Sequence, residues 1–186
     1  MPSDVDLERV RARDPSALEG FFDAFFDRTY GLIFRLTGSH ATAEDLTQDT
    51  FLKIHGALDT LDPARDPWPW VATIATNVCR DHWDAASSRL HARSRSLDDD
   101  PILAAELLDG RPGPADTART NEEATLVQEA LGKVPEPARL VVLLHDWQGL
   151  RHDEIAQMTG QSHAAVRQQY HRALATLGKL LEVLKP

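Results

Sequence analysis

Side chains that could contact nucleic acid gather near the C-terminus of this sequence. The stretch 163–181 holds Arg167, Arg172 and Lys179 and no acidic residue. Guanidinium groups bond phosphates or the O6 and N7 acceptors of guanine, and an amide such as that of Gln168 fits the N6 and N7 edge of adenine. These residue types predict a surface that contacts duplex DNA in its major groove.

No comparable arrangement serves catalysis or metal binding. The histidines His40, His55, His82 and His91 are scattered, and no His-Glu-x-x-His motif, glycine-rich phosphate loop or nucleophile elbow occurs. The single cysteine, Cys79, excludes an internal disulfide and a cysteine cluster for zinc. The sequence therefore indicates that the chain is not an enzyme, and we expect no catalytic residue, no metal site and no cofactor.

A helix-turn-helix pattern would position the basic side chains. Ile155 and Ala156 fall on a short helix, where the small Ala156 lets a second helix approach closely. Gly160 suits a turn with positive φ, and Ser162 can cap the next helix, which Val166 packs against the first. The DNA-contacting side chains would then be His163, Arg167, Gln168, His171 and Arg172. A plain helical hairpin with a solvated basic face stays open as the alternative.

The rest of the chain is also patterned for helices, without the sustained period-two alternation that would indicate a strand. Asp-Pro pairs at 14–15 and 66–67 match an N-cap followed by proline in the first helical turn. Thr42 with Asp45 resembles a capping box. We therefore predict an all-α fold, with helices over about 15–38, 42–58, 67–83, 121–134, 140–147, 152–158 and 163–184.

Composition divides the chain into two helical units. Serines, an acidic run at 98–100 and a Gly/Pro cluster at 110–114 mark a stretch that buries too little apolar surface to offset its ordering entropy. The apolar patch 102–108 leaves open a helix packed on the first unit. The predicted organisation is an N-terminal helical bundle over 1–90, a flexible linker over 91–120, and a C-terminal four-helix domain containing the helix-turn-helix over 121–186.

The bulk composition is that of an ordinary soluble globular protein, with 42% hydrophobic and 26% charged residues. No apolar run approaches the roughly 20 residues that span a bilayer, and the first residues lack the apolar core of a secretory signal. We expect a cytoplasmic protein without membrane insertion. Because phosphate contacts supply most non-specific affinity, the net charge of −9 predicts that the chain binds DNA weakly alone and needs a partner.

Two separated blocks of the sequence resemble extracytoplasmic-function (ECF) sigma factors, the smallest sigma-70-type subunits of bacterial RNA polymerase. Residues 43–55 (AEDLTQDTFLKIH) and 70–81 (WVATIATNVCRD) resemble sigma region 2. Residues 134–144 (VPEPARLVVLL) and 149–173 resemble sigma region 4. Together with the linker they cover about residues 15–180, and their order and separation make the resemblance specific.

The resemblance implies a sigma factor that binds core RNA polymerase and directs promoter-specific initiation. The surface that docks on the clamp coiled coil of the β′ subunit would comprise Asp45, Gln48, Asp49, Phe51 and Lys53. The helix-turn-helix would recognise the minus-thirty-five duplex, while the opposite face of its domain meets the β flap. An anti-sigma protein that holds the two domains together is a further implied partner.

The melted minus-ten element would be captured by the second half of region 2. A side-chain amide can bond the Watson–Crick edge of an extruded base, and aromatic walls can stack on it. The residues implied are Asn77 for the base and Arg80, His82 and Arg89 for the phosphates. Trp70 is interpreted as a core residue, and Trp83 is left open between core and surface.

The chain departs from the family pattern at two places. Where the family follows the Asn77 position with a run of Arg and Lys, this chain has Asp-His-Trp-Asp at 81–84. Its recognition helix has glutamines at 168–169, where the family often carries a basic residue. Both changes remove phosphate contacts. A stand-alone helix-turn-helix regulator is the alternative function; it would explain residues 121–186 and leave both region 2 blocks without a role.

Overall fold

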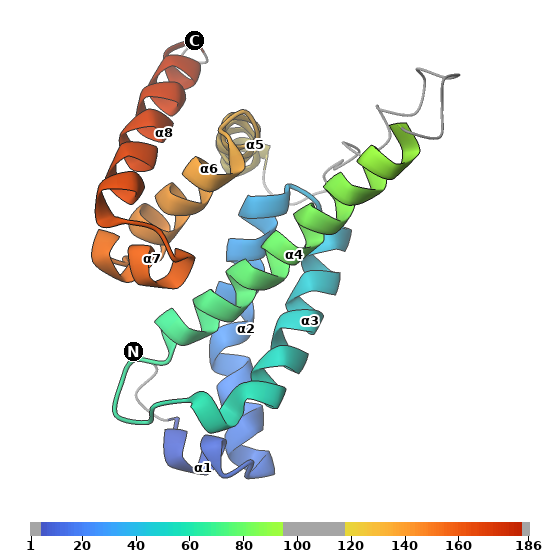
Figure 1. The fold of residues 1–186 in the computed structure, drawn as a ribbon, viewed down its shortest axis with the longest axis vertical. Helices are drawn as coiled ribbons and strands as arrows, with labels where there is room; N and C mark the ends of the chain where they lie inside the picture. The colour runs from blue at the N-terminus through green and yellow to red at the C-terminus, as the bar shows by residue number, and fades with distance from the viewer. Residues whose placement is uncertain (1–4, 95–117, 184–186) are drawn as a thin grey trace.

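The computed structural model describes residues 5–94 and 118–183, which form two packed units built entirely of helices and turns (Figure 1). No strand occurs within these two ranges, so the all-α prediction is confirmed. The predicted linker falls largely between the two ranges, and its apolar patch 102–108 lies outside the described residues. No helix in the described ranges is long and apolar enough to cross a membrane.

The first unit is a bundle of three long helices with a short one beneath them. Its elements are α1 (Leu7–Arg11), α2 (Pro15–Thr37), α3 (His40–Ala57), the 3₁₀ turn η1 (Leu58–Thr60) and α4 (Trp68–Ser94). The helix α1 was not predicted, because five residues are too few to show a helical period. The helix α4 runs past the predicted domain boundary at residue 90.

Capping side chains set where these helices begin. Asp14 accepts a hydrogen bond from the Ala17 amide at the start of α2, as the sequence predicts. At the start of α3 the predicted capping box at Thr42 is wrong. Ser39 is the N-cap and accepts from the Thr42 amide, since the left-handed Gly38 (φ 73°) ends α2 one residue earlier and lets α3 follow at once.

The interior of the first unit is mainly apolar, with a few buried threonines. Phe21, Leu32, Ile33 and Ile54 have no exposed surface, and Trp68 is 1% exposed. The α4 helix contributes its buried side chains at helical spacing, namely Val71, Ala72, Ala75, Val78 and Cys79. These buried side chains give α4 one face that packs into the core.

The second unit contains α5 (Ala118–Gly132), α6 (Glu136–Val142), the π-helical turn η4 (Leu143–Trp147), α7 (His152–Thr159) and α8 (His163–Val183). The expected break at Pro135 and Pro137 is smaller than the sequence suggests. Pro135 is the N-cap of α6 and Pro137 lies in its first turn, where a missing backbone N–H costs no hydrogen bond. The helix thus starts four residues before the predicted Leu140.

Side chains of the second unit cap the open end of α2 in the first. Gln128 donates to the carbonyl oxygens of Phe34 (3.4 Å) and Arg35 (3.3 Å), and Arg139 donates to that of Leu36 (2.7 Å). The last carbonyls of a helix have no partner within it, so these bonds satisfy groups that α2 leaves open. Burial lowers the pKa of the Arg139 guanidinium.

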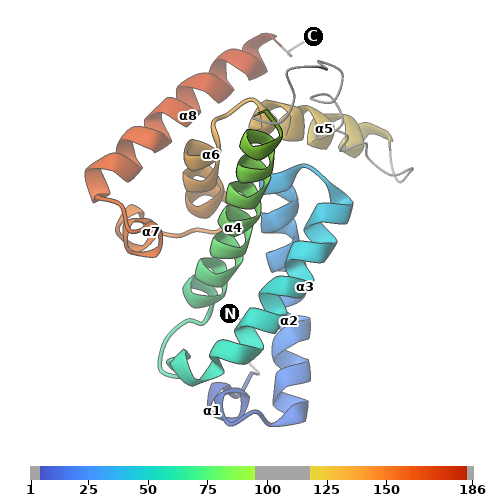
Figure 2. The same cartoon turned by 45° about the vertical axis from the view of Figure 1, so that its right-hand side comes forward.

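Two arginines of α2 hold the η4 end of the second unit. Arg28 donates from Nε to Gln148 Oε1 (2.7 Å) and from Nη2 to the Gln148 carbonyl (2.9 Å). The Arg35 guanidinium lies 3.9 Å from the ring centre of Trp147. Since α7 also contacts α4, the two units pack along two helices of the bundle, while α3 lies on its opposite side (Figures 1 and 2).

Candidate nucleic-acid interface

The helix-turn-helix forms as the sequence predicts. Gly160 has φ 67°, a left-handed conformation that favours glycine, and it ends α7. Ser162 Oγ accepts from the Ala165 amide (3.2 Å) and caps α8. Ile155 and Val166 have no exposed surface, so they join α7 to α8 at the core. The crossing of the two helices is therefore fixed by packing on one side and by the turn on the other.

The outer face of α8 carries all five predicted DNA-contacting side chains. His163, Arg167 and His171 follow one another at intervals of four residues, and Gln168 with Arg172 form a parallel row. All five are exposed. Figures 1 and 2 show α8 at the outer edge of the molecule, away from the first unit. The face is thus open to a large polyanion.

Aromatic rings behind this face were not predicted as part of the site. His152 of α7 lies 4.2 Å from the His145 ring and 6.2 Å from the His163 ring, measured between ring centres. Tyr170 of α8 lies 4.9 Å from His145 and 5.0 Å from His152. We call His145, His152, His163, Tyr170 and His171 the ring cluster. Helical spacing links only residues of one helix, so the sequence could not show this grouping across three elements.

Hydrogen bonds and burial fix the electrostatics of the ring cluster. His145 Nδ1 donates to the Leu150 carbonyl (2.8 Å), because a carbonyl can only accept. Tyr170 donates its hydroxyl to Asp146 (2.8 Å), and burial followed by this bond raises the pKa of the phenol. Burial, followed by the charges of His145, His163, Arg167 and His171, lowers the pKa of His152.

The predicted minus-ten side chains lie along α4 with uneven exposure. Asn77 and Arg80 are half-buried, and Arg80 Nη1 donates to Asn77 Oδ1 at 3.4 Å. His82 is half-buried near the middle of the helix. Arg89 falls in the last turns of α4, where its side chain lies outside the described part of the structure. The structure thus brings Asn77 and Arg80 together and places His82 on a different side of α4.

A cleft of about 640 Å³ opens one turn before Asn77, between the two units. The first unit supplies the 60–67 loop together with Trp70 and Thr73, and the second unit supplies Gln157 and Met158 from α7. Trp70 Nε1 donates to Thr60 Oγ1 (3.1 Å). Helical periodicity alone did not reveal this cleft, because half of its wall is a loop.

The two neighbouring tryptophans at the start of α4 differ in burial. Trp68 is buried under the Arg28 guanidinium, which lies 3.9 Å from its ring centre. Trp70 packs against the core in part, as interpreted, and it also lines the cleft, which was not predicted. Trp83 is also half-buried and packs against the core, which favours the core interpretation that was left open.

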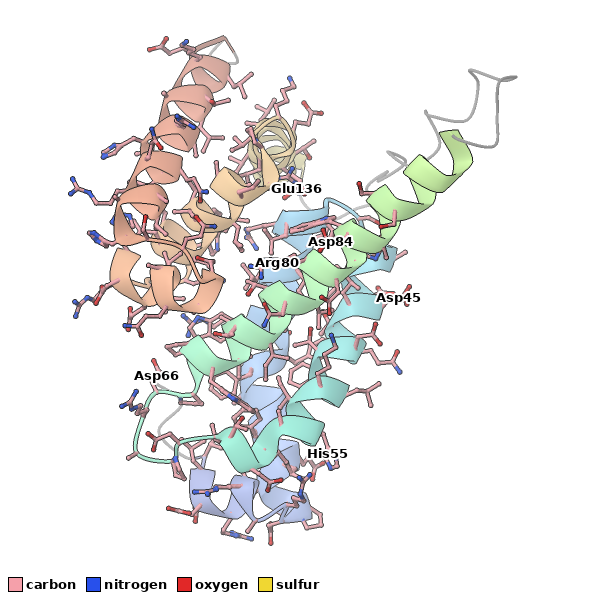
Figure 3. The ribbon with its side chains drawn as sticks, viewed as in Figure 1. Asp45, His55, Asp66, Arg80, Asp84 and Glu136 are labelled. Carbon is pink, nitrogen blue, oxygen red and sulfur yellow. The ribbon has the colours of Figure 1, made fainter. Side chains whose placement is uncertain are left out.

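The predicted polymerase-docking residues lie on α3, on the side of the bundle turned away from the second unit. Asp45, Gln48 and Asp49 are exposed, and Asp45 points outward in Figure 3. Leu52 continues their row and is 65% exposed, although it was not predicted. Phe51 is half-buried, with its ring 5.2 Å from that of Phe22. The face combines carboxylates with exposed apolar groups.

Lys53 is turned toward α4 instead. Its Nζ lies 2.8 Å from Asp81 Oδ2, and both side chains are more than half exposed. Exposed ion pairs contribute about 0–1 kcal/mol, so this contact can exchange for another partner at little cost.

The described residues contain no group of three or more His, Cys, Asp or Glu side chains placed to hold a metal ion. Cys79 is fully buried, and burial raises its pKa to about 12. Thiol chemistry needs the thiolate, so this residue belongs to the packing of α4.

Family models match both units of the chain. Sigma-70 region 2 matches residues 21–89, and sigma-70 region 4 matches residues 124–177. The chain is 31% identical to the RNA polymerase sigma factor CarQ of Myxococcus xanthus, over 96% of this chain and 97% of CarQ. It is 29% identical to the ECF RNA polymerase sigma factor BldN of Streptomyces coelicolor, over 94% of this chain and 64% of BldN.

Solved structures show the same fold. The structure of CnrH in complex with the cytosolic domain of CnrY has a TM-score of 0.68 and 23% identity, covering 97% of this chain and 99% of that one. The sigma factor RpoE in complex with the anti-sigma factor NepR, from Bartonella quintana, also has a TM-score of 0.68, with 18% identity, covering 90% and 98%. The arrangement of helices is therefore one that solved proteins share.

Proposed function

This chain belongs to the ECF group of the sigma-70 family, and from that premise we propose that it binds core RNA polymerase and directs it to promoters. It would recognise the minus-thirty-five duplex through α8 and the melted minus-ten strand through α4. The observation that carries the proposal is the exposed row of His163, Arg167 and His171 on a helix-turn-helix within the region 4 match. We propose a cytoplasmic DNA-binding factor with no catalytic activity of its own.

The minus-thirty-five contact would follow the chemistry of α8. Arg167 and Arg172 suit guanine edges or phosphates, and Gln168 suits adenine. The exposed N-terminal turn of α8 presents amide groups and the positive end of the helix dipole to phosphate. A chain of net charge −9 offers few other phosphate contacts, so the polymerase would supply the remaining affinity by holding the chain close to DNA.

The minus-ten contact would use the cleft beside α4. An extruded base could stack on Trp70 in this cleft, and Asn77 lies two turns further along the same face of α4, where it could contact the melted strand. In the packed arrangement α7 forms the opposite wall of this cleft. The two promoter elements are roughly 25 base pairs apart, about 85 Å along the duplex, so the units must separate for both contacts to form.

The polymerase would meet the chain at α3, through Asp45, Gln48, Asp49 and Phe51, with Lys53 released from Asp81. Carboxylates around partly exposed apolar groups suit a mixed interface with a basic coiled coil. We propose the β′ clamp coiled coil as this partner and the β flap as the partner of the second unit. An anti-sigma protein is a further proposed partner, since CnrH and RpoE are similar folds with partner proteins bound.

A mobility-shift experiment tests the assignment. A promoter fragment is incubated with the chain alone, with core polymerase alone, and with both. We expect a sequence-specific complex only with both, and its loss for the variant D45A/D49A, which removes two exposed α3 carboxylates. The variant D23A/D27A removes two exposed carboxylates from α2 and is the charge-matched control.

The stand-alone regulator is the competing function, and the same gel separates it. Tight, sequence-specific binding by the chain without core polymerase would favour the regulator and refute the sigma-factor proposal.

A further inference from the structure

The ring cluster gives the α8 face an unusual supply of titratable groups. Its four imidazoles come from three elements: His145 from η4, His152 from α7, and His163 and His171 from α8. Rings from all three elements are in contact, so their charges influence one another. Two of the four, His163 and His171, are exposed beside Arg167 on the outer face.

The two inner rings, His145 and His152, are enclosed by other groups of the cluster. His145 uses Nδ1 to donate to the Leu150 carbonyl. Nε2 of His152 is buried without a hydrogen-bond partner, so a proton there would have no acceptor. The remaining positive groups of the cluster also oppose a charge on His152 and lower its pKa. A positive charge on His152 is therefore disfavoured, and the exposed His163 and His171 are the rings that an external anion can reach.

The acidic groups around the cluster are engaged elsewhere. Asp146 accepts from Tyr170, Asp153 accepts two bonds from Arg151, and Glu154 accepts from the Arg151 amide. The titratable and charged groups on the packed elements are, element by element, His145 and Asp146 on η4, Arg151, His152, Asp153 and Glu154 around α7, Glu136 and Arg139 on α6, Glu129 on α5, and Arg167, Tyr170, Arg172, Lys179 and Glu182 on α8. None of the described ion pairs joins a carboxylate to His163 or His171, which leaves these two imidazoles available to an external anion.

We propose that duplex DNA is bound with uptake of protons at His163 and His171, so that the affinity of this chain for DNA rises as the pH falls through the range in which imidazoles titrate. The inference rests on the proposed function, because it assigns the α8 face to DNA. A phosphate beside an imidazole favours its charged form, and an ordinary histidine titrates near pH 6.5. Protonated His163 and His171 would extend Arg167 into a row of three cations. The row would supply phosphate contacts that the glutamines at 168–169 do not.

The test measures binding of the full chain to a fluorescein-labelled 30-base-pair duplex of mixed sequence, by anisotropy in about 20 mM salt. The pH runs from 8.0 to 6.0, within the range in which circular dichroism shows the chain fully helical. We expect Kd to fall about tenfold for the wild type and less than about threefold for H163Q/H171Q. The variant H55Q removes an exposed histidine from α3 and should behave like the wild type.

Equal pH dependence in the wild type and H163Q/H171Q would overturn the proposal, and so would a flat wild-type profile or no binding at any pH. Transcription with core polymerase at pH 7.5 distinguishes failure of the proton-linkage proposal from failure of the proposed sigma-factor function. If the wild-type chain supports initiation at pH 7.5 but its Kd for DNA does not change with pH, the proton-linkage proposal is wrong and the sigma-factor function stands. If it supports neither, the assignment of the α8 face to promoter DNA is wrong as well.

Discussion

The surroundings of His152 disfavour a positive charge on its imidazole. Burial and neighbouring cationic groups lower its pKa in the folded chain, so the unfolded chain binds more protons below about pH 6.5. The contribution of this histidine to stability is therefore fully present above that pH and is lost as the pH falls. We expect the free energy of unfolding, measured in urea, to decrease between pH 7.5 and 5.5.

The variant H152Q should weaken this acid sensitivity, because glutamine does not titrate. Unfolding of H55Q, which changes an exposed histidine, should keep the wild-type dependence. An H152Q chain as acid-sensitive as the wild type would show that other groups cause the loss.

Cys79 makes a second prediction at the scale of one residue. The thiol is buried in α4 and its pKa is raised to about 12, so the folded chain holds almost no thiolate at pH 8. We expect no reaction with a disulfide reagent in native buffer and one equivalent of reaction in denaturant. Rapid modification of the native chain would mean that α4 opens locally around this position.

Single residues were predictable where one local rule governs them. Asp14, Gly160 and Ser162 act through their own backbone neighbours, and each has the role that the sequence predicts. The place of Trp70 in the cleft wall was not predicted, because the 60–67 loop that lines the cleft with it lies outside the helical pattern. The ring cluster was not predicted either, because rings from three different elements come into contact only through tertiary packing.

At the scale of elements, the turn between α7 and α8 requires a left-handed backbone conformation. Gly160 has a left-handed φ, and a Cβ there meets no neighbouring atom, so the cost of alanine is backbone strain alone. We expect G160A to lower the free energy of unfolding by about 1 kcal/mol. The matched control is G178A, in the middle of α8 with equal space, which should raise stability by about 0.5–1 kcal/mol. Urea unfolding measures both, and equal signs would contradict this account.

Element boundaries show where sequence patterns stop being informative. The periods of α2, α3 and α8 are long enough to predict these helices within a few residues. The start of α6 was missed because proline ends a helix in its interior and is tolerated in the first turn, and the pattern alone does not distinguish the two. The end of α4 was missed because its last turns extend beyond the apolar repeat that defines its buried face.

At the scale of the whole molecule, the packing of the two units is the property that the sequence did not predict. It depends on contacts such as Arg28 with Gln148 and Arg139 with the Leu36 carbonyl, which join residues more than 100 positions apart. No local pattern reports on such pairs. The packed form could not span two promoter elements, so the proposed function requires the two units to separate.

Opening is testable by small-angle scattering. A compact chain of 186 residues has a radius of gyration of about 16 Å, and the free wild type should lie near this value. The variant R28A/R139A removes hydrogen bonds between the units and should be measurably larger. R9A/R65A removes two arginines whose ion pairs stay within the first unit, and it should match the wild type. No expansion in R28A/R139A would show that the apolar contacts alone hold the units together.

The central claim is that this chain gives core RNA polymerase promoter specificity. Transcription in vitro from fragmented genomic DNA of the bacterium that encodes the chain tests it most directly, with sequencing of the RNA 5′ ends. The account predicts that core polymerase with the chain initiates at a small set of sites sharing two sequence elements about 25 base pairs apart, and that core polymerase alone does not. The same scattered initiation with and without the chain would contradict it.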